Sequence, residues 1–157
     1  MFKIKIVCVG KMKEAYFRDA TAEYVKRLSR FAEVTLREVK EENIVERPSE
    51  KEKQEIMRRE SEHIAKELCG DIVVLAVEGK QRSSEAFAEE LAALRDGKGE
   101  VTFVIGGSYG LAPEIKARAK TLLSFSKMTL PHTLMRVVLL EQIYRACMID
   151  AGSTYHK

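Results

Sequence analysis

Residues 71–77 read Asp-Ile-Val-Val-Leu-Ala-Val, a segment between Gly70 and Glu78-Gly79 that is apolar without interruption after Asp71. A run rich in β-branched residues and bounded by glycines is typical of a strand buried on both faces of a parallel sheet. A second apolar run, residues 101–105, ends at two adjacent glycines. These two runs predict the centre of the fold.

Further strands and helices are predicted on either side of these runs. Residues 2–9 alternate as a strand with one buried face, residues 34–39 read as a short strand, and residues 122–128 as a weaker one. Helical spacing or helix-start signals predict helices at residues 13–31, 49–68, 84–95 and 131–152, with Pro113 as the first residue of another. Strands that alternate with helices indicate an α/β domain with a mainly parallel sheet and flanking helices, a single domain over residues 1–157.

The composition excludes several classes of protein. The 157 residues are 45% hydrophobic and 32% charged, and a domain of this length buries about two-thirds of its unfolded surface without a disulfide or metal. The uncharged apolar runs, such as residues 137–140, are far shorter than the ~20 residues of a transmembrane helix. The N-terminus has no signal-peptide pattern, so we expect a cytoplasmic protein.

The cysteines and the net charge point to no particular chemistry. Cys8, Cys69 and Cys147 are an odd number without CxxC spacing, which favours buried or inert thiols in a reducing compartment. Lys and Arg number 27 against 24 Asp and Glu, a net charge of +3. This balance allows an anionic partner such as nucleic acid without requiring one.

A glycine turn at residues 106–110 is the first candidate binding site. Glycine lets a ligand approach the backbone closely, and ligands of open α/β sheets gather at the carboxyl ends of strands. The spacing matches neither GxGxxG nor GxxxxGK[ST], which disfavours a nicotinamide or ATP site. A tight turn that needs glycine for its dihedral angles alone is the alternative.

Residues 122–132 are the second candidate. Small hydroxyls, apolar side chains and Pro131, which lacks an N–H, suit a loop whose free backbone groups hold a flat heterocycle. The alternative is a strand followed by a proline-initiated helix that binds nothing, with His132 an ordinary polar residue.

The C-terminal helix and tail are the remaining candidates. Residues 133–149 are apolar on nearly all faces, which predicts a second subunit packed against the helix and hence a homodimer. Glu141 and Arg145 in this helix stand four residues apart, and a simple ion pair is the alternative to a functional role. The tail 155–157 could stack on a base, move a proton and hold a phosphate, or it could be a frayed terminus.

Together these motifs resemble the bacterial ribosomal RNA large-subunit methyltransferase H family. The resemblance covers essentially the whole chain. It rests on Phe-Val-Ile-Gly-Gly-Ser-Tyr-Gly at 103–110, Leu-Ser-Phe-Ser-Lys-Met-Thr-Leu-Pro-His at 123–132, Arg-Val at 136–137 with Glu-Gln-Ile-Tyr-Arg-Ala at 141–146, Tyr-His-Lys at 155–157, and Ile-Val-Cys-Val-Gly-Lys at 6–11.

The resemblance implies a fold, a reaction and a site. The fold is SPOUT, with a C-terminal part threaded into a trefoil knot, in a homodimer. The reaction transfers a methyl group from S-adenosylmethionine to N3 of a pseudouridine in large-subunit ribosomal RNA, on assembled ribosomes. The cofactor-binding residues carried over onto this sequence are Leu75, Gly107, Ser126, Lys127, Met128, Thr129, Leu130 and Pro131.

The chemistry of this reaction suggests roles for the tail. The methyl donor is an activated sulfonium, so transfer requires alignment and no metal. The N3 proton must leave, and His156 and Arg145 are the candidates for a general base or a charge that stabilises the anion. Tyr155 is expected to stack on the target base, and Tyr155, His156 and Lys157 to contact RNA. Lys157 stands where some family members have arginine, which offers a planar fork in place of a point charge.

Two other function classes stay open at this point. One is an oxidoreductase or hydrolase on a nucleotide-binding sheet, which the missing phosphate loops disfavour. The other is a catalytically silent RNA- or ribosome-binding module of the same fold, which the intact cofactor motifs disfavour. No role is assigned to the charged loop Lys40–Pro48.

Overall fold

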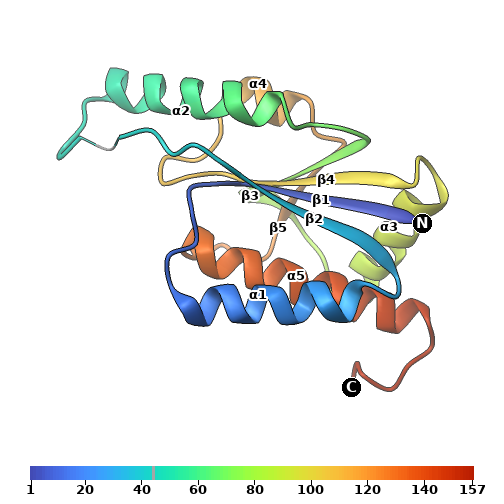
Figure 1. The fold of residues 1–157 in the computed structure, drawn as a ribbon. Helices are drawn as coiled ribbons and strands as arrows, with labels where there is room; N and C mark the ends of the chain where they lie inside the picture. Colours follow the sequence, from blue (N-terminus) through green and yellow to red (C-terminus); the bar gives the residue numbers. More distant parts are fainter. Residues whose placement is uncertain (44) are drawn as a thin grey trace.

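Five parallel strands form the centre of the fold (Figure 1). They are β1 (Phe2–Val9), β2 (Ala32–Val39), β3 (Asp71–Gln81), β4 (Glu100–Ile105) and β5 (Thr121–Ser124), in the order β2-β1-β4-β3-β5. All four neighbouring pairs are parallel. The α/β fold with a parallel sheet, expected from the sequence, is therefore confirmed. The computed structural model describes residues 1–43 and 45–157, so Ile44, in the charged loop Lys40–Pro48, lies outside the described residues.

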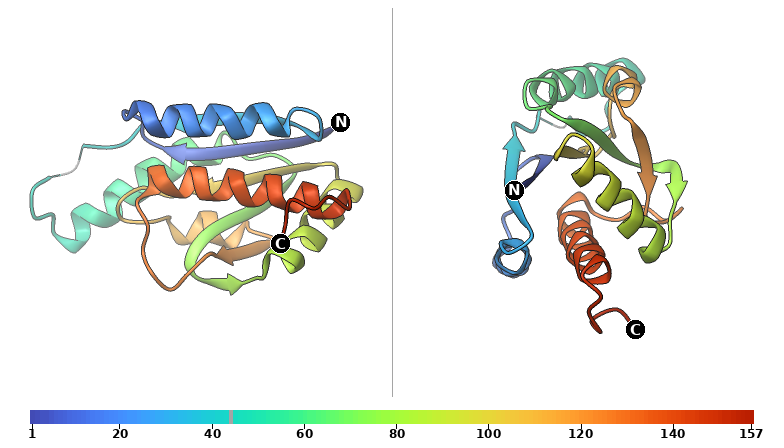
Figure 2. Two further views of the ribbon diagram at one scale, coloured as in Figure 1. Left: turned by 90° about the horizontal axis from the view of Figure 1, so that it is seen from below. Right: turned by 90° about the vertical axis from the view of Figure 1, so that its right-hand side faces the viewer.

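Helices cover both faces of the sheet. They are α1 (Ala15–Leu28), α2 (Glu50–Ala65), α3 (Ser84–Asp96), α4 (Pro113–Ala117) and α5 (His132–Asp150). Figure 1 shows α2 and α4 on one face and α1, α3 and α5 on the other. In Figure 2, α5 runs alongside α1, and it contacts both α1 and α3.

Local signals in the sequence start three of the helices. Ser49 and Glu52 form the predicted capping box: the Ser49 hydroxyl accepts a hydrogen bond from the Glu52 N–H, and the Glu52 carboxylate accepts one from the Ser49 N–H, both 3.2 Å long. The Ser83 hydroxyl accepts from the Ala86 N–H at the start of α3. Pro113 is the first residue of α4, as predicted.

Two strands differ from expectation in the faces that they bury. The sequence predicts one buried face for β1, but residues from Ile6 to Val9 are buried on both faces because β1 lies between β2 and β4 with helices above and below. By contrast, β3 is fully buried only over its first four residues, and Val77 is 48% exposed. The two apolar cores lie on opposite faces of these strands.

Some element bounds also differ. The strand predicted at 122–128 ends at Ser124, because the Ser124 hydroxyl donates to the carbonyl of Ser126 and the Ser126 hydroxyl accepts from the Met128 N–H, which turns the chain out of the sheet. The first helix begins at Ala15 and ends at Leu28, shorter than the predicted 13–31, and α2 ends at Ala65 rather than 68.

A single chain covers much of α5. Residues 132–149 are all buried or half-buried, because α1 and α3 flank the helix under the sheet. The expectation that one domain could not cover this helix is therefore wrong in part. Half-buried apolar side chains stay on the helix at Leu134, Val137 and Val138. Among the described residues, no helix combines the length and apolar character that crossing a membrane requires.

Candidate active site

A cavity of about 570 Å³ lies at the carboxyl ends of β3, β4 and β5. This is the edge where parallel α/β sheets bind ligands, and the volume suits a nucleoside-sized molecule. Its walls come from residues 75–78 of β3, residues 105–111 after β4, the loop 125–131 and the start of α5, with Lys116 from α4.

An irregularity in β3 forms the first wall. The pairing of β3 with β5 shifts between Leu75 and Lys80, so the residues between them bulge out of the ladder toward the cavity. A Cβ at Gly79 would lie 2.8 Å from the carbonyl of Leu122. Only glycine therefore lets β3 rejoin β5 after the bulge.

The glycine turn forms the second wall. Gly110 has a φ of +81° and donates its N–H to the carbonyl of Gly107 at 3.0 Å. A Cβ at Gly106 would lie 2.9 Å from Leu111, and one at Gly107 would lie 2.9 Å from Oε1 of Glu60 and 3.1 Å from Val9. The first two glycines are thus required by packing behind the turn, and dihedral angle alone explains only Gly110.

The loop 125–131 forms the third wall and brings the predicted cofactor residues together. Eight cofactor-binding residues are expected from the resemblance to the family. Seven of them line the cavity, namely Leu75, Gly107, Ser126, Met128, Thr129, Leu130 and Pro131. Lys127 lies in the same loop but does not line the cavity.

The cavity also contains charged and titratable side chains outside the predicted set of cofactor residues. Lys116 donates to the Glu78 carboxylate over 2.5 Å, and this bond, with a backbone hydrogen bond, holds the pKa of Glu78 below its usual value. His132 lines the cavity too, and burial and the nearby Arg136 lower the pKa of its imidazole. Glu78 lies one residue beyond the strand expected at 71–77, and the sequence pattern favours only an ordinary polar role for His132.

Arg136 fixes the start of α5 against the sheet. Its side chain is 1% exposed and donates to the carbonyls of Val9 at 2.9 Å and Gly10 at 2.8 Å, and to the Glu38 carboxylate at 2.7 Å. These partners lie at the ends of β1 and β2. Arg136 therefore sets the position of the helix turn that contributes His132 and Met135 to the cavity.

The predicted tail residues form a second cluster at the other end of α5. The Glu141 carboxylate accepts from Arg145 at 2.5 Å and from the Tyr155 hydroxyl at 3.2 Å. The Arg145 guanidinium donates to Nδ1 of His156 over 3.1 Å, and Nε2 of His156 lies 2.7 Å from the Glu85 carboxylate at the start of α3. The ion pair between Glu141 and Arg145 is present, and the hydrogen bonds of Tyr155 and His156 contradict a frayed terminus.

The Tyr155 ring is packed rather than free. Its centroid lies 4.9 Å from that of Tyr144 in an edge-on arrangement, and the guanidinium of Arg145 stands 4.8 Å from the same ring. Burial and the neighbouring Glu141 raise the pKa of the Tyr155 hydroxyl. Lys157 is exposed at the end of the chain.

The cavity and the tail cluster are separate within one chain. None of the described tail residues lines the cavity. His132 and Arg145 are 13 residues apart on α5, which corresponds to about 20 Å along the helix axis. A single molecule therefore does not bring the two predicted parts of the site together.

No metal site stands out near either cluster. Across residues 1–43 and 45–157, no group of three or more His, Cys, Asp or Glu side chains has an arrangement that could hold a metal ion. The arrangement described is a cavity with a few polar groups on one side of the molecule and a hydrogen-bonded cluster of cations, carboxylates and an aromatic ring on another.

Comparisons with known proteins agree with this architecture. A family model described as "Predicted SPOUT methyltransferase" matches residues 2–156. A solved structure, titled as a putative methylase family protein from Neisseria gonorrhoeae, superposes with a TM-score of 0.53 at 14% identity and covers 98% of this chain and 86% of that one. At that identity the likeness shows the fold alone.

Curated relatives are much closer in sequence. Proteins named "Ribosomal RNA large subunit methyltransferase H" are 54% identical in Lactobacillus acidophilus, covering 98% of this chain and 99% of the relative, and 51% identical in Streptococcus equi subsp. zooepidemicus, covering 99% of each. The chain belongs to the SPOUT methyltransferases and, within them, to the ribosomal RNA large subunit methyltransferase H family.

Proposed function

We propose that this protein transfers a methyl group from S-adenosylmethionine to N3 of a pseudouridine in large-subunit ribosomal RNA, on assembled ribosomes. The observation that carries the proposal is the cavity at the carboxyl ends of β3, β4 and β5, between the glycine turn and the loop 125–131. Membership of the family, whose named relatives are ribosomal RNA methyltransferases, supports the RNA substrate. The proposal also implies a cytoplasmic protein, and no metal in the reaction.

The residues of the cavity fit the proposed cofactor. Its lining is largely apolar, with backbone groups and the hydroxyls of Ser126 and Thr129 available to orient a heterocycle and a ribose. S-adenosylmethionine, when bound there, supplies a methyl group on a positively charged sulfur that leaves as a neutral thioether. Leu75, Leu130 and Pro131 would enclose it and exclude water, while the Glu78–Lys116 pair supplies a carboxylate and an ammonium within the same cavity.

A homodimer explains why the tail lies away from the cavity. Alignment of donor and acceptor requires the substrate-contacting groups to converge within a few ångströms, whereas about 20 Å of helix separates the two clusters in one chain. We propose that the tail of one subunit completes the cavity of the other. The half-buried apolar side chains Leu134, Val137 and Val138 on α5 supply a surface for that contact.

The proposed roles of the tail follow from its contacts. The N3 proton of the target must be removed, and the Arg145 guanidinium, held by Glu141, would stabilise the negative charge left on the ring. His156 would act with it as the general base once RNA displaces its present partners, Arg145 and Glu85. Tyr155 would stack on the target base, and Tyr155, His156 and Lys157 would contact the RNA.

The connectivity is compatible with the trefoil knot that we also propose for the C-terminal part. The loop 125–131 and α5 follow β5 directly, and the loop shares the cavity with the glycine turn after β4. A knot in this region would hold both loops in the conformation that forms the cavity.

Two measurements test the function. Calorimetry should detect binding of S-adenosylmethionine and none of NAD or ATP. Mass spectrometry of ribosomal RNA from a deletion strain should show the loss of one methylated pseudouridine, restored when purified protein and S-adenosylmethionine are added to that strain's ribosomes. Cofactor binding without any missing methyl group would instead identify a catalytically silent ribosome-binding module.

A further inference from the structure

A buried carboxyl group lies behind the glycine turn. Glu60 of α2 is 3% exposed. Its Oε2 accepts a hydrogen bond from the N–H of Glu42 at 3.1 Å, whereas its Oε1 is buried and has no hydrogen-bond partner among the described residues. A buried carboxyl oxygen without a partner is costly, and far more so when the group is ionised. Such a group calls for an explanation.

The unpartnered oxygen packs directly against the cavity wall. Oε1 of Glu60 stands 2.9 Å from the point where a Cβ at Gly107 would be. The next residue of α2, Ser61, accepts a hydrogen bond from the N–H of Ala112 at 3.2 Å, just after the turn. Successive residues of α2 thus support the turn 106–110 from behind, while Gly107 and Ser108 line the cavity in front.

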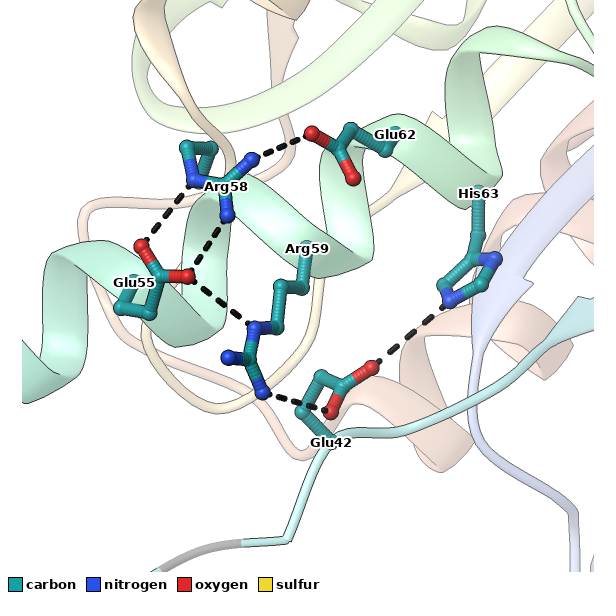
Figure 3. A network of polar contacts seen from close by, with 6 residues as sticks. All are labelled: Glu42, Glu55, Arg58, Arg59, Glu62 and His63. Carbon is teal, nitrogen blue, oxygen red and sulfur yellow. Dashed lines mark hydrogen bonds and ion pairs between the residues drawn. The ribbon is translucent and has the colours of Figure 1, made fainter.

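The charges around Glu60 favour its neutral form. Burial raises the pKa of the Glu60 carboxyl, Glu41 and Glu42 raise it further, and the hydrogen bond from the Glu42 backbone opposes them. Glu42 itself pairs with Arg59 and His63 of α2 (Figure 3). The N–O separations are 4.0 Å to Arg59 and 3.6 Å to His63. Gly107, which the Glu60 carboxyl approaches, and Val9, which lies on the same side of Gly107, carry no charge.

We infer that Glu60 is a positioning residue for the cofactor cavity: as a neutral carboxyl it supports the glycine turn in the conformation that forms the cavity wall, and its ionisation loosens the turn. An ionised Glu60 would be drawn toward water and away from Glu41 and Glu42, and its withdrawal removes the contact behind Gly107. Glu60 does not line the cavity, so it acts through the turn. The inference rests on the proposed use of the cavity for S-adenosylmethionine.

The sign of the pH effect follows from the raised pKa. The neutral form persists above the pH at which an ordinary glutamate ionises, so support for the turn is complete at low pH and lost as the pH rises through the pKa of folded Glu60. The Glu60-dependent part of the affinity for S-adenosylmethionine should therefore fall with rising pH. One pKa unit of coupling between cofactor and Glu60 corresponds to about a tenfold change in the dissociation constant.

The test compares three versions of the full chain. The dissociation constant of S-adenosylmethionine is measured by calorimetry from pH 5 to pH 8.5 for the wild type, Glu60→Gln and Glu60→Ala. Glu60→Gln keeps the shape of the neutral carboxyl, so it should bind as tightly as the wild type does at pH 5 and lose the Glu60-dependent fall in affinity. Glu60→Ala should bind about tenfold more weakly than Glu60→Gln throughout, because the turn has lost its contact.

Matched controls isolate Glu60 from other titrating groups. Glu62→Gln, an exposed carboxylate on the same helix, and His63→Gln should both retain the wild-type pH profile. Titration of the cofactor itself is common to all variants and cancels in the comparison. In the free wild-type protein, the exchange rates of the Gly107 and Ser108 amides should show the same opening as the pH rises, after correction for intrinsic exchange.

The outcomes separate the two proposals. If the wild type does not bind S-adenosylmethionine at all, the proposed function fails. If it binds and Glu60→Gln shows the wild-type pH profile, or if Glu60→Gln loses as much affinity as Glu60→Ala, the inference about Glu60 is overturned while the function stands.

Discussion

The two ends of helix α5 differ in their burial and in the groups that they contact. At its start, Arg136 is buried against the ends of β1 and β2, and the first helical turn lines the cavity. At its end, Arg145 is a quarter exposed and joins Glu141, Tyr155 and His156 in a cluster bound to each other and to α3. The cavity end of α5 is held by buried contacts with the sheet, whereas the tail end is held by partly exposed contacts at the surface. Both ends are needed for RNA methylation under our proposal, so two chains must cooperate.

The largest expected effect is a loss of activity, and it distinguishes the tail end of α5 from the cavity end. Removal of residues 155–157 deletes the proposed stacking ring and RNA contacts but leaves the cavity lining intact. Methyl transfer to ribosomes should fall by about 10³-fold or more, because a positioned proton acceptor alone contributes about 10²–10⁴-fold. Affinity for S-adenosylmethionine should stay unchanged in calorimetry.

His156→Ala in the same assay should be milder than the truncation. An unchanged transfer rate in the truncated protein would leave the tail without a catalytic role.

The next effect is a loss of stability, which should be larger for a substitution at the cavity end of α5 than for one at the tail end. Arg136→Met leaves the carbonyls of Val9 and Gly10 without their donor and Glu38 without its partner. The free energy of unfolding should fall by about 3 kcal/mol. Arg145→Met removes a partly exposed pair on the same helix and should cost at most about 1 kcal/mol.

Urea unfolding of both variants measures the difference, at equal protein concentration because the proposed dimer would contribute to stability. Equal losses in the free energy of unfolding would contradict the structural difference between Arg136 and Arg145.

A smaller effect tests the cavity wall itself. Leu130→Arg introduces bulk and a positive charge into a half-buried position of the lining, next to a cationic ligand, and should weaken binding of S-adenosylmethionine about a hundredfold or more. Lys127→Ala changes a neighbouring residue that does not line the cavity and should leave binding within about twofold of the wild type. A Lys127→Ala loss as large as that of Leu130→Arg would contradict the geometry of the loop.

The last prediction is that the cysteine thiols near both ends of α5 are unreactive in the folded protein. Burial raises the pKa of Cys8, beside Arg136, to about 12 and that of Cys147, in the last turns of α5, to about 11. The thiolate is the reactive form, so neither thiol should be appreciably ionised until the pH approaches those values. Mass spectrometry after iodoacetamide treatment at pH 8 should find both unmodified in the folded protein and alkylated in urea.

The sequence predicted the sheet better than the site. Strand positions follow from apolar runs such as 71–77, although only the first four residues of that run are fully buried, and α2 begins where its capping box predicts. The bulge at residues 76–79 and the cavity role of Glu78 were missed, because a register shift depends on which strand lies alongside. Composition alone did not indicate that α1 and α3 would cover α5.

The candidate site was predicted as a set of residues rather than as an arrangement. Family motifs brought out the cavity loop and the tail, but linear order could not reveal that α5 holds them apart. Glu60 was out of reach for a related reason. Its contact with Gly107 joins residues 47 positions apart, and nothing in the charged pattern of α2 distinguishes it from the solvated glutamates around it.

The central claim is that a cavity and a tail from different chains form one active site, and a mixed dimer tests it most directly. One chain carries Leu130→Arg and the other lacks residues 155–157, with different affinity tags so that the heterodimer can be purified after co-expression. Each homodimer should be inactive on ribosomes. The heterodimer retains one intact cavity facing one intact tail, so it should recover about half of the wild-type activity per dimer. A heterodimer as inactive as its parents would contradict the account.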